Sequence, residues 1–180
     1  MRYSTSFFTC NLNTAQDFIA EEHKHLPHFK LREFSLQLFQ HCPLLTHLVD
    51  DFDSLYESFI AHRYKIPVCG VIMLNKNLDQ VVLVRNWKGS SWSFPKGKIN
   101  EEENPFDCAI RETIEETGFD PTAYCNADTY LTVKGDDQKT VTLFVATGVP
   151  LDTEFCPQTR KEISKVEFHF IDNLPKNAWG

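Results

Sequence analysis

The sequence predicts an α/β domain preceded by a small all-α region. Apolar residues recur at helical spacing in the first third of the chain, and strand-like apolar runs alternate with a helical segment after Pro67. The periodicity changes near Ile66 and Pro67. We therefore expect a helical domain at residues 1–65 and an α/β domain at residues 66–180, a length that suits this division.

The helical region contains two amphipathic segments separated by Pro43. The first segment has its apolar stripe at Leu31, Phe34, Leu38 and Phe39. The second has its stripe at Phe52, Leu55, Tyr56, Phe59, Ile60 and Tyr64. A region of about 65 residues buries little apolar surface, so we expect it to be only marginally stable alone.

The second region contains segments that are expected to form two β-hairpins and one further strand. Residues 68–74 and 81–85 are rich in Val, Ile and Leu, and the turn-forming sequence NKNLDQ joins them. Residues 129–133 and 140–145 flank a second turn sequence, KGDDQK. Another strand is expected at residues 166–170.

Between the two hairpins, three glutamates stand at helical spacing. Glu112, Glu115 and Glu116 occupy positions i, i+3 and i+4, which lie on one face of a helix, so their carboxylates should converge. Like charges at this spacing destabilise a helix by roughly 0.2–0.5 kcal/mol per pair. A hard cation such as Mg²⁺ or Mn²⁺ would neutralise them. The alternative is a solvated helix face.

The three glutamates are part of a longer pattern. Its fixed positions are Gly97, Glu103, Arg111, Glu112, Glu115, Glu116, Gly118 and Phe119. This pattern resembles the signature of the Nudix hydrolase family, except that Thr113 stands where the family has an aliphatic residue. The resemblance implies a Nudix α/β/α sandwich with a mixed sheet, and cleavage of a nucleoside diphosphate linked to another group.

The remaining residues of the pattern have structural interpretations. We expect Glu103 and Arg111 to pair, which would fasten the preceding loop to the helix. Gly118 should end the helix in a left-handed conformation. Ile110 and Ile114 should pack the face opposite the metal onto the sheet.

Charge is strongly segregated along the chain, although the net charge is only −7. Residues 60–100 carry seven Lys or Arg against one acid, and residues 101–120 carry eight acids against one Arg. A basic block beside an acidic metal-binding block fits a polyanionic substrate with its phosphates on the metal. A chance arrangement of surface charge is the alternative.

Composition narrows the class of protein further. The six cysteines include no Cys-x-x-Cys pair, which argues against a zinc site. No segment approaches 18 apolar residues, so we expect no membrane span, and no secretory signal is visible. These features favour a cytoplasmic or nuclear protein with reduced thiols.

Three further segments resemble the mRNA-decapping branch of the Nudix family. They are FQHCPLL at residues 39–45, WSFPKGKI at residues 92–99 and RKEISKVEF at residues 160–168. The resemblance implies hydrolysis of the 5′ cap of mRNA, releasing 7-methylguanosine diphosphate and RNA with a 5′ monophosphate. It also implies capped RNA as substrate, a regulatory or cap-recognition role for residues 1–65, and a decapping-activator protein bound to that helical region.

The resemblance assigns roles to individual residues. The implied metal ligands are the carbonyl of Gly97 and the carboxylates of Glu112, Glu115, Glu116 and Glu162. Glu162 is also the implied general base, and Glu116 is the second residue expected to be catalytic.

Basic residues near these glutamates are the candidates for substrate binding. Lys96 and Lys98 are placed to hold phosphates, and Arg160, Lys161 and Lys165 surround Glu162 as a strip suited to an RNA backbone. Ordinary solvated surface charge is the alternative for both groups.

The cap-binding part of the family pattern is incomplete. The decapping branch stacks the methylated guanine on a tryptophan beside an acid, but this chain has no tryptophan before Trp87. Alignment places Asp17 at the tryptophan position and Glu21 at the acid, and Phe18 is the candidate stacking residue unless it is part of a core. Trp87, Trp92 and Trp179 are expected to be packing residues.

Two other functions fit the same residues. One is a Nudix hydrolase of small dinucleoside polyphosphates or inositol pyrophosphates, which would not need the helical region. The other, from a different class, is a catalytically weak RNA- or protein-binding module that works through its helical surface. Retention of every repelling glutamate argues against this last function.

Overall fold

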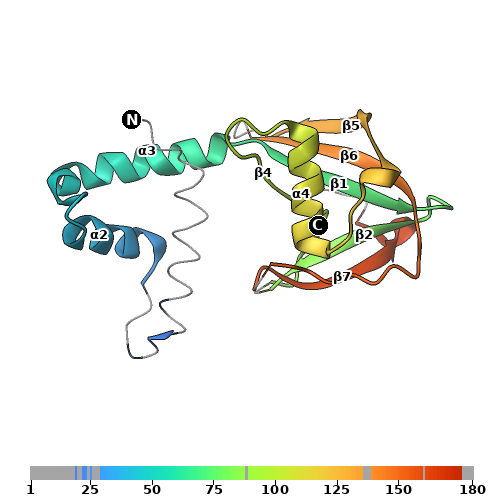
Figure 1. Cartoon of the computed structure of the whole chain (residues 1–180), viewed down its shortest axis with the longest axis horizontal. Helices are drawn as coiled ribbons and strands as arrows, with labels where there is room; N and C mark the ends of the chain where they lie inside the picture. The colour runs from blue at the N-terminus through green and yellow to red at the C-terminus, as the bar shows by residue number, and fades with distance from the viewer. Residues whose placement is uncertain are drawn as a thin grey trace. The chain divides into compact units, whose positions relative to one another are not determined.

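A computed structural model describes residues 19, 22, 23, 25, 29–87, 89–135, 139–159 and 161–175. The chain divides into two compact units, Met1–Lys65 and Ile66–Gly180. Figure 1 shows helices in the first, here called the helical unit, and a sheet with a helix against it in the second, the sheet unit. No helix among these residues is long and apolar enough to cross a bilayer.

The helical unit is built from α2 (Leu31–His41), η1 (Thr46–Asp51) and α3 (Phe52–Lys65), which confirms the expected helical region. Glu33 begins α2 by accepting a 2.9 Å hydrogen bond from the Lys30 N–H. The Phe52 ring lies 5.2 Å from Phe39 and 5.7 Å from Tyr56. The described core of this unit is therefore a small aromatic cluster between α2 and α3.

The sheet unit contains a mixed sheet, as expected, and among the described residues it has seven strands, two more than the five predicted segments. Its elements are β1 (Val68–Asn75), β2 (Gln80–Asn86), β3 (Trp92–Ser93), β4 (Lys96–Lys98), α4 (Pro105–Thr117), η2 (Thr122–Tyr124), β5 (Cys125–Lys134), β6 (Thr140–Val149), β7 (Ile163–Phe170) and η3 (Ile171–Asn173). The central order is β3-β2-β1-β6-β5, with β4 paired to β1 and β7 paired to β2.

Strand pairing confirms both hairpins predicted from the sequence. β1 pairs antiparallel with β2, and β5 pairs antiparallel with β6. The pairing of β1 with β6 is parallel and joins the two hairpins at the centre of the sheet. Parallel strands are usually buried on both faces, and β1 is buried or half-buried along its whole length.

Helix α4 has clear start and stop signals. The Asn104 side chain accepts a 2.9 Å hydrogen bond from the Asp107 N–H, and Pro105 stands in the first turn. Gly118 ends the helix at φ 74°, a left-handed conformation that favours glycine, as predicted. The helix therefore presents its residues in a fixed rotation to the sheet.

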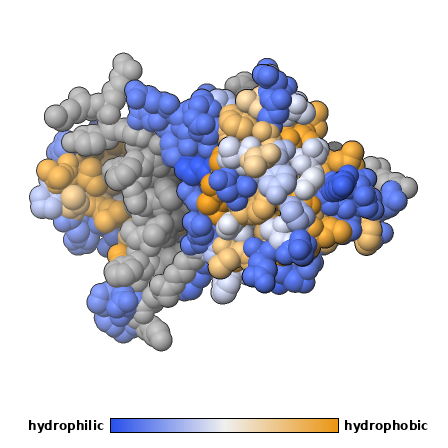
Figure 2. Space-filling view, turned by 45° about the vertical axis from the view of Figure 1, so that its right-hand side comes forward, coloured by the Kyte–Doolittle hydropathy of each residue, from blue (hydrophilic) through white to orange (hydrophobic). Residues whose placement is uncertain are grey.

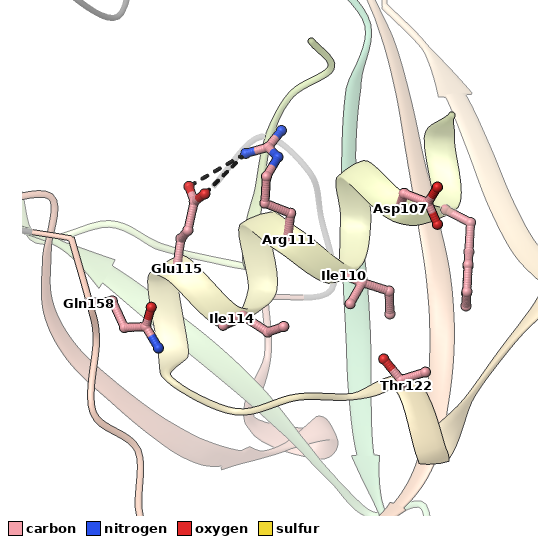
Figure 3. A pocket seen from close by; sticks show the side chains of 8 residues that line it. Asp107, Ile110, Arg111, Ile114, Glu115, Thr122 and Gln158 are labelled. Carbon is pink, nitrogen blue, oxygen red and sulfur yellow. Dashed lines mark hydrogen bonds and ion pairs between the residues drawn. The ribbon is translucent and has the colours of Figure 1, made fainter. Parts of the chain in front are cut away.

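The buried face of α4 differs from the one predicted. Cys108, Ala109, Thr113 and Thr117 are its buried residues. Ile110 and Ile114 instead line a surface pocket of about 440 Å³ with Thr122 and Gln158, as Figure 3 shows. Thr113 is accepted in the core because its hydroxyl donates a 2.7 Å hydrogen bond to the Ala109 carbonyl.

Below α4 lies the main hydrophobic core, which comes mostly from β1 and β6. The buried cluster comprises Cys69, Val71, Met73, Val82, Cys108, Ala109, Phe144, Ala146 and Val149. The surface of the sheet unit mixes hydrophobic and hydrophilic residues (Figure 2). Its exposed large hydrophobic residues are Leu78, Trp87, Tyr130, Leu131, Val133, Leu151, Phe170 and Ile171.

Candidate active site

Close packing of β4 against α4 places Gly97 beside the helix glutamates. Gly97 pairs with Cys69 of β1, and a Cβ atom added to it would lie 1.9 Å from the Glu112 carboxylate. A side chain at this position would push the Glu112 carboxylate away from β4. Glycine therefore lets the backbone of β4 and the Glu112 carboxylate lie directly against each other.

Arg111 is at the centre of the acidic cluster. Its guanidinium makes a bidentate pair with Glu103 at 2.7 and 2.9 Å, which confirms the predicted pair. It also contacts Glu112 at 2.7 Å and Glu115 at 3.4 Å, the second contact being drawn in Figure 3. The Arg111 side chain lowers the pKa of Glu103, so this carboxylate stays ionised in mildly acidic solution.

Glu116 faces the backbone of β4 and not Arg111. The Lys96 N–H donates a 3.0 Å hydrogen bond to its carboxylate. Burial raises the pKa of Glu116 to about 7, although the hydrogen bond and charge of Lys96 oppose the rise, while Glu112 and Glu162 add to it. Such a carboxyl group exchanges protons in the neutral range unless a cation stabilises its charge.

Lys96 is itself half-buried next to this carboxylate. Its ammonium group donates a 3.3 Å hydrogen bond to the Phe94 carbonyl. Burial lowers the pKa of Lys96, and the negative charge of Glu116 partly restores it. This predicted phosphate ligand therefore lies at the site, close to Glu116.

Glu162 comes from a different part of the chain, directly before β7. Its carbonyl accepts a 2.8 Å hydrogen bond from the Trp87 N–H, which fixes its backbone to the end of β2. Partial burial raises the pKa of Glu162, and the charge of Glu115 raises it further. Glu162 also raises the pKa of Glu112. The sheet thus brings Glu162 into the electrostatic field of the α4 glutamates.

The three α4 carboxylates are held by different partners. Within the described residues, no three His, Cys, Asp or Glu side chains form a ready cation site, and the convergence of the three α4 carboxylates on a cation stays a prediction. The reason is that Arg111 draws Glu112 and Glu115, whereas Lys96 holds Glu116. Rotation of these side chains would be needed to gather the oxygens.

The chemistry of the residues nevertheless fits a divalent cation. The donors are hard carboxylate oxygens together with the Gly97 carbonyl, which is the ligand type that Mg²⁺ and Mn²⁺ prefer. Burial and mutual repulsion raise the pKa values of Glu112, Glu116 and Glu162. A bound cation would relieve this penalty.

The other predicted substrate residues are distributed around the cluster. Lys98 is half-buried at the end of β4, where its carbonyl accepts a 3.2 Å hydrogen bond from Arg111. Lys161 is exposed next to Glu162, and Lys165 forms a 2.5 Å ion pair with Glu167. The candidates Phe18, Glu21 and Arg160 lie outside the described residues, as do Asp17 and Trp179.

Trp92 and Trp87 differ in how far they are buried. Trp92 is half-buried, as expected for a packing residue. The centre of its ring lies 4.4 Å from that of the His169 ring and 5.7 Å from the Arg85 guanidinium. Trp87 was predicted to pack as well, and this prediction is wrong because 53% of the residue is exposed. Its position after β2, between Arg85 and Lys88, was the available sequence signal.

Comparison with known families agrees with this architecture. The NUDIX domain matches residues 64–180, and the Dcp2, box A domain matches residues 15–62. A solved structure of an Ap4A hydrolase binary complex from Caenorhabditis elegans superposes with a TM-score of 0.50 at 20% identity, over 59% of this chain and 81% of that one. This likeness supports the fold alone.

Two curated relatives align with nearly the whole chain. The mRNA decapping complex subunit 2 of Schizosaccharomyces pombe is 45% identical over 163 residues, covering 89% of this chain and 22% of the relative. The m7GpppN-mRNA hydrolase dcap-2 of Caenorhabditis elegans is 42% identical over 151 residues, covering 83% of this chain and 19% of the relative. The chain therefore spans about a fifth of the length of these two relatives.

Proposed function

Because this chain belongs to the Nudix family, we propose that it is the catalytic part of an mRNA-decapping hydrolase. It would hydrolyse the 5′ cap and release 7-methylguanosine diphosphate and RNA with a 5′ monophosphate. One observation carries the proposal: a box A match precedes a Nudix unit in which Glu162 lies in the field of the α4 glutamates. The relatives named as decapping enzymes share both parts of the chain.

Five groups would hold the divalent ion in this proposal. They are the Gly97 carbonyl and the carboxylates of Glu112, Glu115, Glu116 and Glu162. When bound, Mg²⁺ or Mn²⁺ would polarise a cap phosphate and lower the pKa of the attacking water. Arg111 would act as a positioning residue, since it already orients Glu112 and Glu115 on one side of α4.

Glu162 is the proposed general base. Its carboxylate would accept a proton from the attacking water, and a raised pKa brings this group closer to the pH at which a base works best. Its backbone is fixed by Trp87, so the carboxylate starts from a defined place on the sheet. Glu116, with a pKa of about 7, is the second group that changes charge in this range.

Basic residues would bind the rest of the substrate. Lys96 and Lys98 flank Gly97 and are proposed to hold phosphates, while Arg160, Lys161 and Lys165 are proposed to contact the RNA backbone. Residues 1–65 would contribute cap recognition, with Phe18 and Glu21 as candidates, and would bind a decapping activator. We also propose that the protein acts in the cytoplasm, with a nuclear pool as the alternative.

The test uses a panel of three substrates. The purified chain is incubated in manganese with one substrate at a time: cap-labelled RNA, a dinucleoside polyphosphate or an inositol pyrophosphate. The products released from each are identified. Manganese-dependent 7-methylguanosine diphosphate from capped RNA, with little turnover of the small substrates, is the expected result. Preference for the small substrates would refute decapping, and RNA binding without turnover of any substrate would favour a binding module.

A further inference from the structure

Trp87 is a neighbour of the proposed general base Glu162, and about half of its surface is exposed to solvent. It is 53% exposed, although a tryptophan side chain gains much free energy when it is buried. Its N–H donates a 2.8 Å hydrogen bond to the carbonyl of Glu162, so the two residues are neighbours across β2 and the start of β7. The backbone thus holds this exposed residue next to the residue that is the proposed general base.

Positively charged side chains accompany Trp87 along the same strands. Arg85, two residues before Trp87, donates a 3.1 Å hydrogen bond from Nε to the Ser164 hydroxyl. Lys165, on β7, is paired in register with Arg85, and Lys161 is exposed next to Glu162. Arg85 also lies over the Trp92 ring, and Lys165 pairs with Glu167. An exposed aromatic residue on strands that carry these basic residues, beside a proposed metal ligand, suits a ligand with both flat bases and phosphates.

Single-stranded nucleic acid has this chemistry. Proteins bind it with aromatic side chains that stack on bases and with basic residues that follow the backbone. Each such stack contributes about 1–3 kcal/mol and tolerates any base. Packing is a weaker account of Trp87, because the described ring contacts of tryptophan involve Trp92 and not Trp87.

We propose that Trp87 is a stacking platform for a nucleobase of the substrate's RNA chain, next to the metal site. This inference rests on the proposed decapping function, because it takes the ligand to be RNA that leaves that site. It adds an RNA-binding residue in the sheet unit, separate from any cap recognition by the helical unit. The cap guanine is the competing source of the base.

Binding is measured first, without turnover. Tryptophan fluorescence of the full chain is titrated with an uncapped oligoadenylate and, separately, with 7-methylguanosine diphosphate. The wild-type protein should be quenched by the oligoadenylate, and Trp87→Leu should lose that quenching together with roughly 5- to 150-fold in affinity, the equivalent of one stack. Trp87→Phe should keep most of the affinity because a phenyl ring also stacks.

Tyr130→Leu is the matched control, since Tyr130 is 54% exposed on β5 and is equally aromatic. Its affinity for the oligoadenylate should equal that of the wild type. An equal loss in both variants, or no loss in Trp87→Leu, would overturn the proposal. Quenching of Trp87 by 7-methylguanosine diphosphate alone would overturn the assignment to the RNA chain.

Turnover then separates a stacking role from a structural one. In Trp87→Leu, KM for capped RNA should rise while kcat stays close to the wild-type value, because the backbone hydrogen bond to Glu162 does not depend on the side chain. A fall in kcat with an unchanged KM would mean that Trp87 only supports Glu162, and the proposal would be wrong. Oligoadenylate quenching without any cap cleavage by the wild type would instead refute the proposed decapping function and leave the base platform standing.

Discussion

The two units of this protein differ in how firmly their residues are held. Among the described residues, the helical unit buries the hydrophobic side chains of Phe34 and Phe52, whereas the sheet unit buries a continuous cluster beneath α4. The proposed catalytic carboxylates belong to the sheet unit. The proposed chemistry, which needs fixed geometry, would therefore use the larger core, and the smaller unit would serve the proposed recognition and regulation.

The largest effect should come from the sheet unit's site. Glu116→Gln removes a proposed metal ligand while keeping the size of the side chain, so decapping turnover should fall by on the order of 10²–10³-fold or more. The melting temperature should not decrease, because the neutral amide avoids the burial penalty of the carboxylate. Manganese-dependent product release and thermal unfolding are measured on the same preparation.

Glu101→Gln is the control for this change, since Glu101 is exposed in the same acidic segment. It should retain wild-type turnover. Normal turnover by Glu116→Gln would remove Glu116 from the site.

A change in the core of the helical unit should lower the stability of that unit, in contrast to Glu116→Gln, which should lower turnover without lowering stability. Phe52→Ala removes the central ring of the aromatic cluster and should destabilise that unit by about 3–5 kcal/mol. Circular dichroism should show an early helical unfolding step, while the sheet unit keeps its own transition. Tyr64→Ala, at a position 60% exposed on α3, should leave the helical transition in place. A single shared transition lowered by Phe52→Ala would show that the units are not independently stable.

The stability of the folded chain should fall as the pH rises, because of the buried carboxyl group of Glu116 in the sheet unit. Burial raises the pKa of Glu116 from 4.5 to about 7, so between these values the folded chain binds more protons than the unfolded chain. Its contribution to stability is therefore complete below pH 4.5 and is lost as the pH rises through about 7. In chelator, the melting temperature of the wild type should fall relative to Glu116→Gln over this range, by the equivalent of roughly 1–3 kcal/mol.

Manganese should reverse that loss at neutral pH, because the ion binds the ionised carboxylates and hence the folded state. A difference in melting temperature between wild type and Glu116→Gln that stays constant over this pH range would mean that Glu116 has an ordinary pKa. That result would contradict a pKa raised by burial.

The smallest effect should come from the unusual residue of the α4 core. Thr113 is fully buried, and its hydroxyl bonds to a carbonyl that the helix already uses. Thr113→Val keeps the shape and should change the free energy of unfolding by no more than about 1 kcal/mol. Chemical denaturation measures this change. A loss several times larger would mean that the hydroxyl is essential to packing.

Much of the sheet unit could be predicted because its signals are local. The two hairpins have turn sequences between strand-forming segments, and Gly118 marks the end of α4 as predicted. The Glu103–Arg111 pair follows from spacing on one helix and its preceding loop. Local pattern also identified the helical segments before Pro67.

What could not be predicted depends on contacts between distant residues. Which face of α4 is buried depends on β1 and β6, so the pattern alone placed Ile110 and Ile114 on the wrong side. The hydrogen bond from Lys96 to Glu116 depends on where β4 crosses α4. Exposure of Trp87 depends on the way β2 ends beside Glu162, and in the sequence it is indicated only by the neighbouring Arg85 and Lys88.

Cap cleavage at the carboxylates of the sheet unit is tested by identifying the labelled nucleotide that the full chain releases from capped RNA in manganese, with Glu116→Gln in parallel. The wild type should release 7-methylguanosine diphosphate, and the variant almost none. Release of a different nucleotide, or of the same one by both proteins, would contradict cap cleavage at these carboxylates.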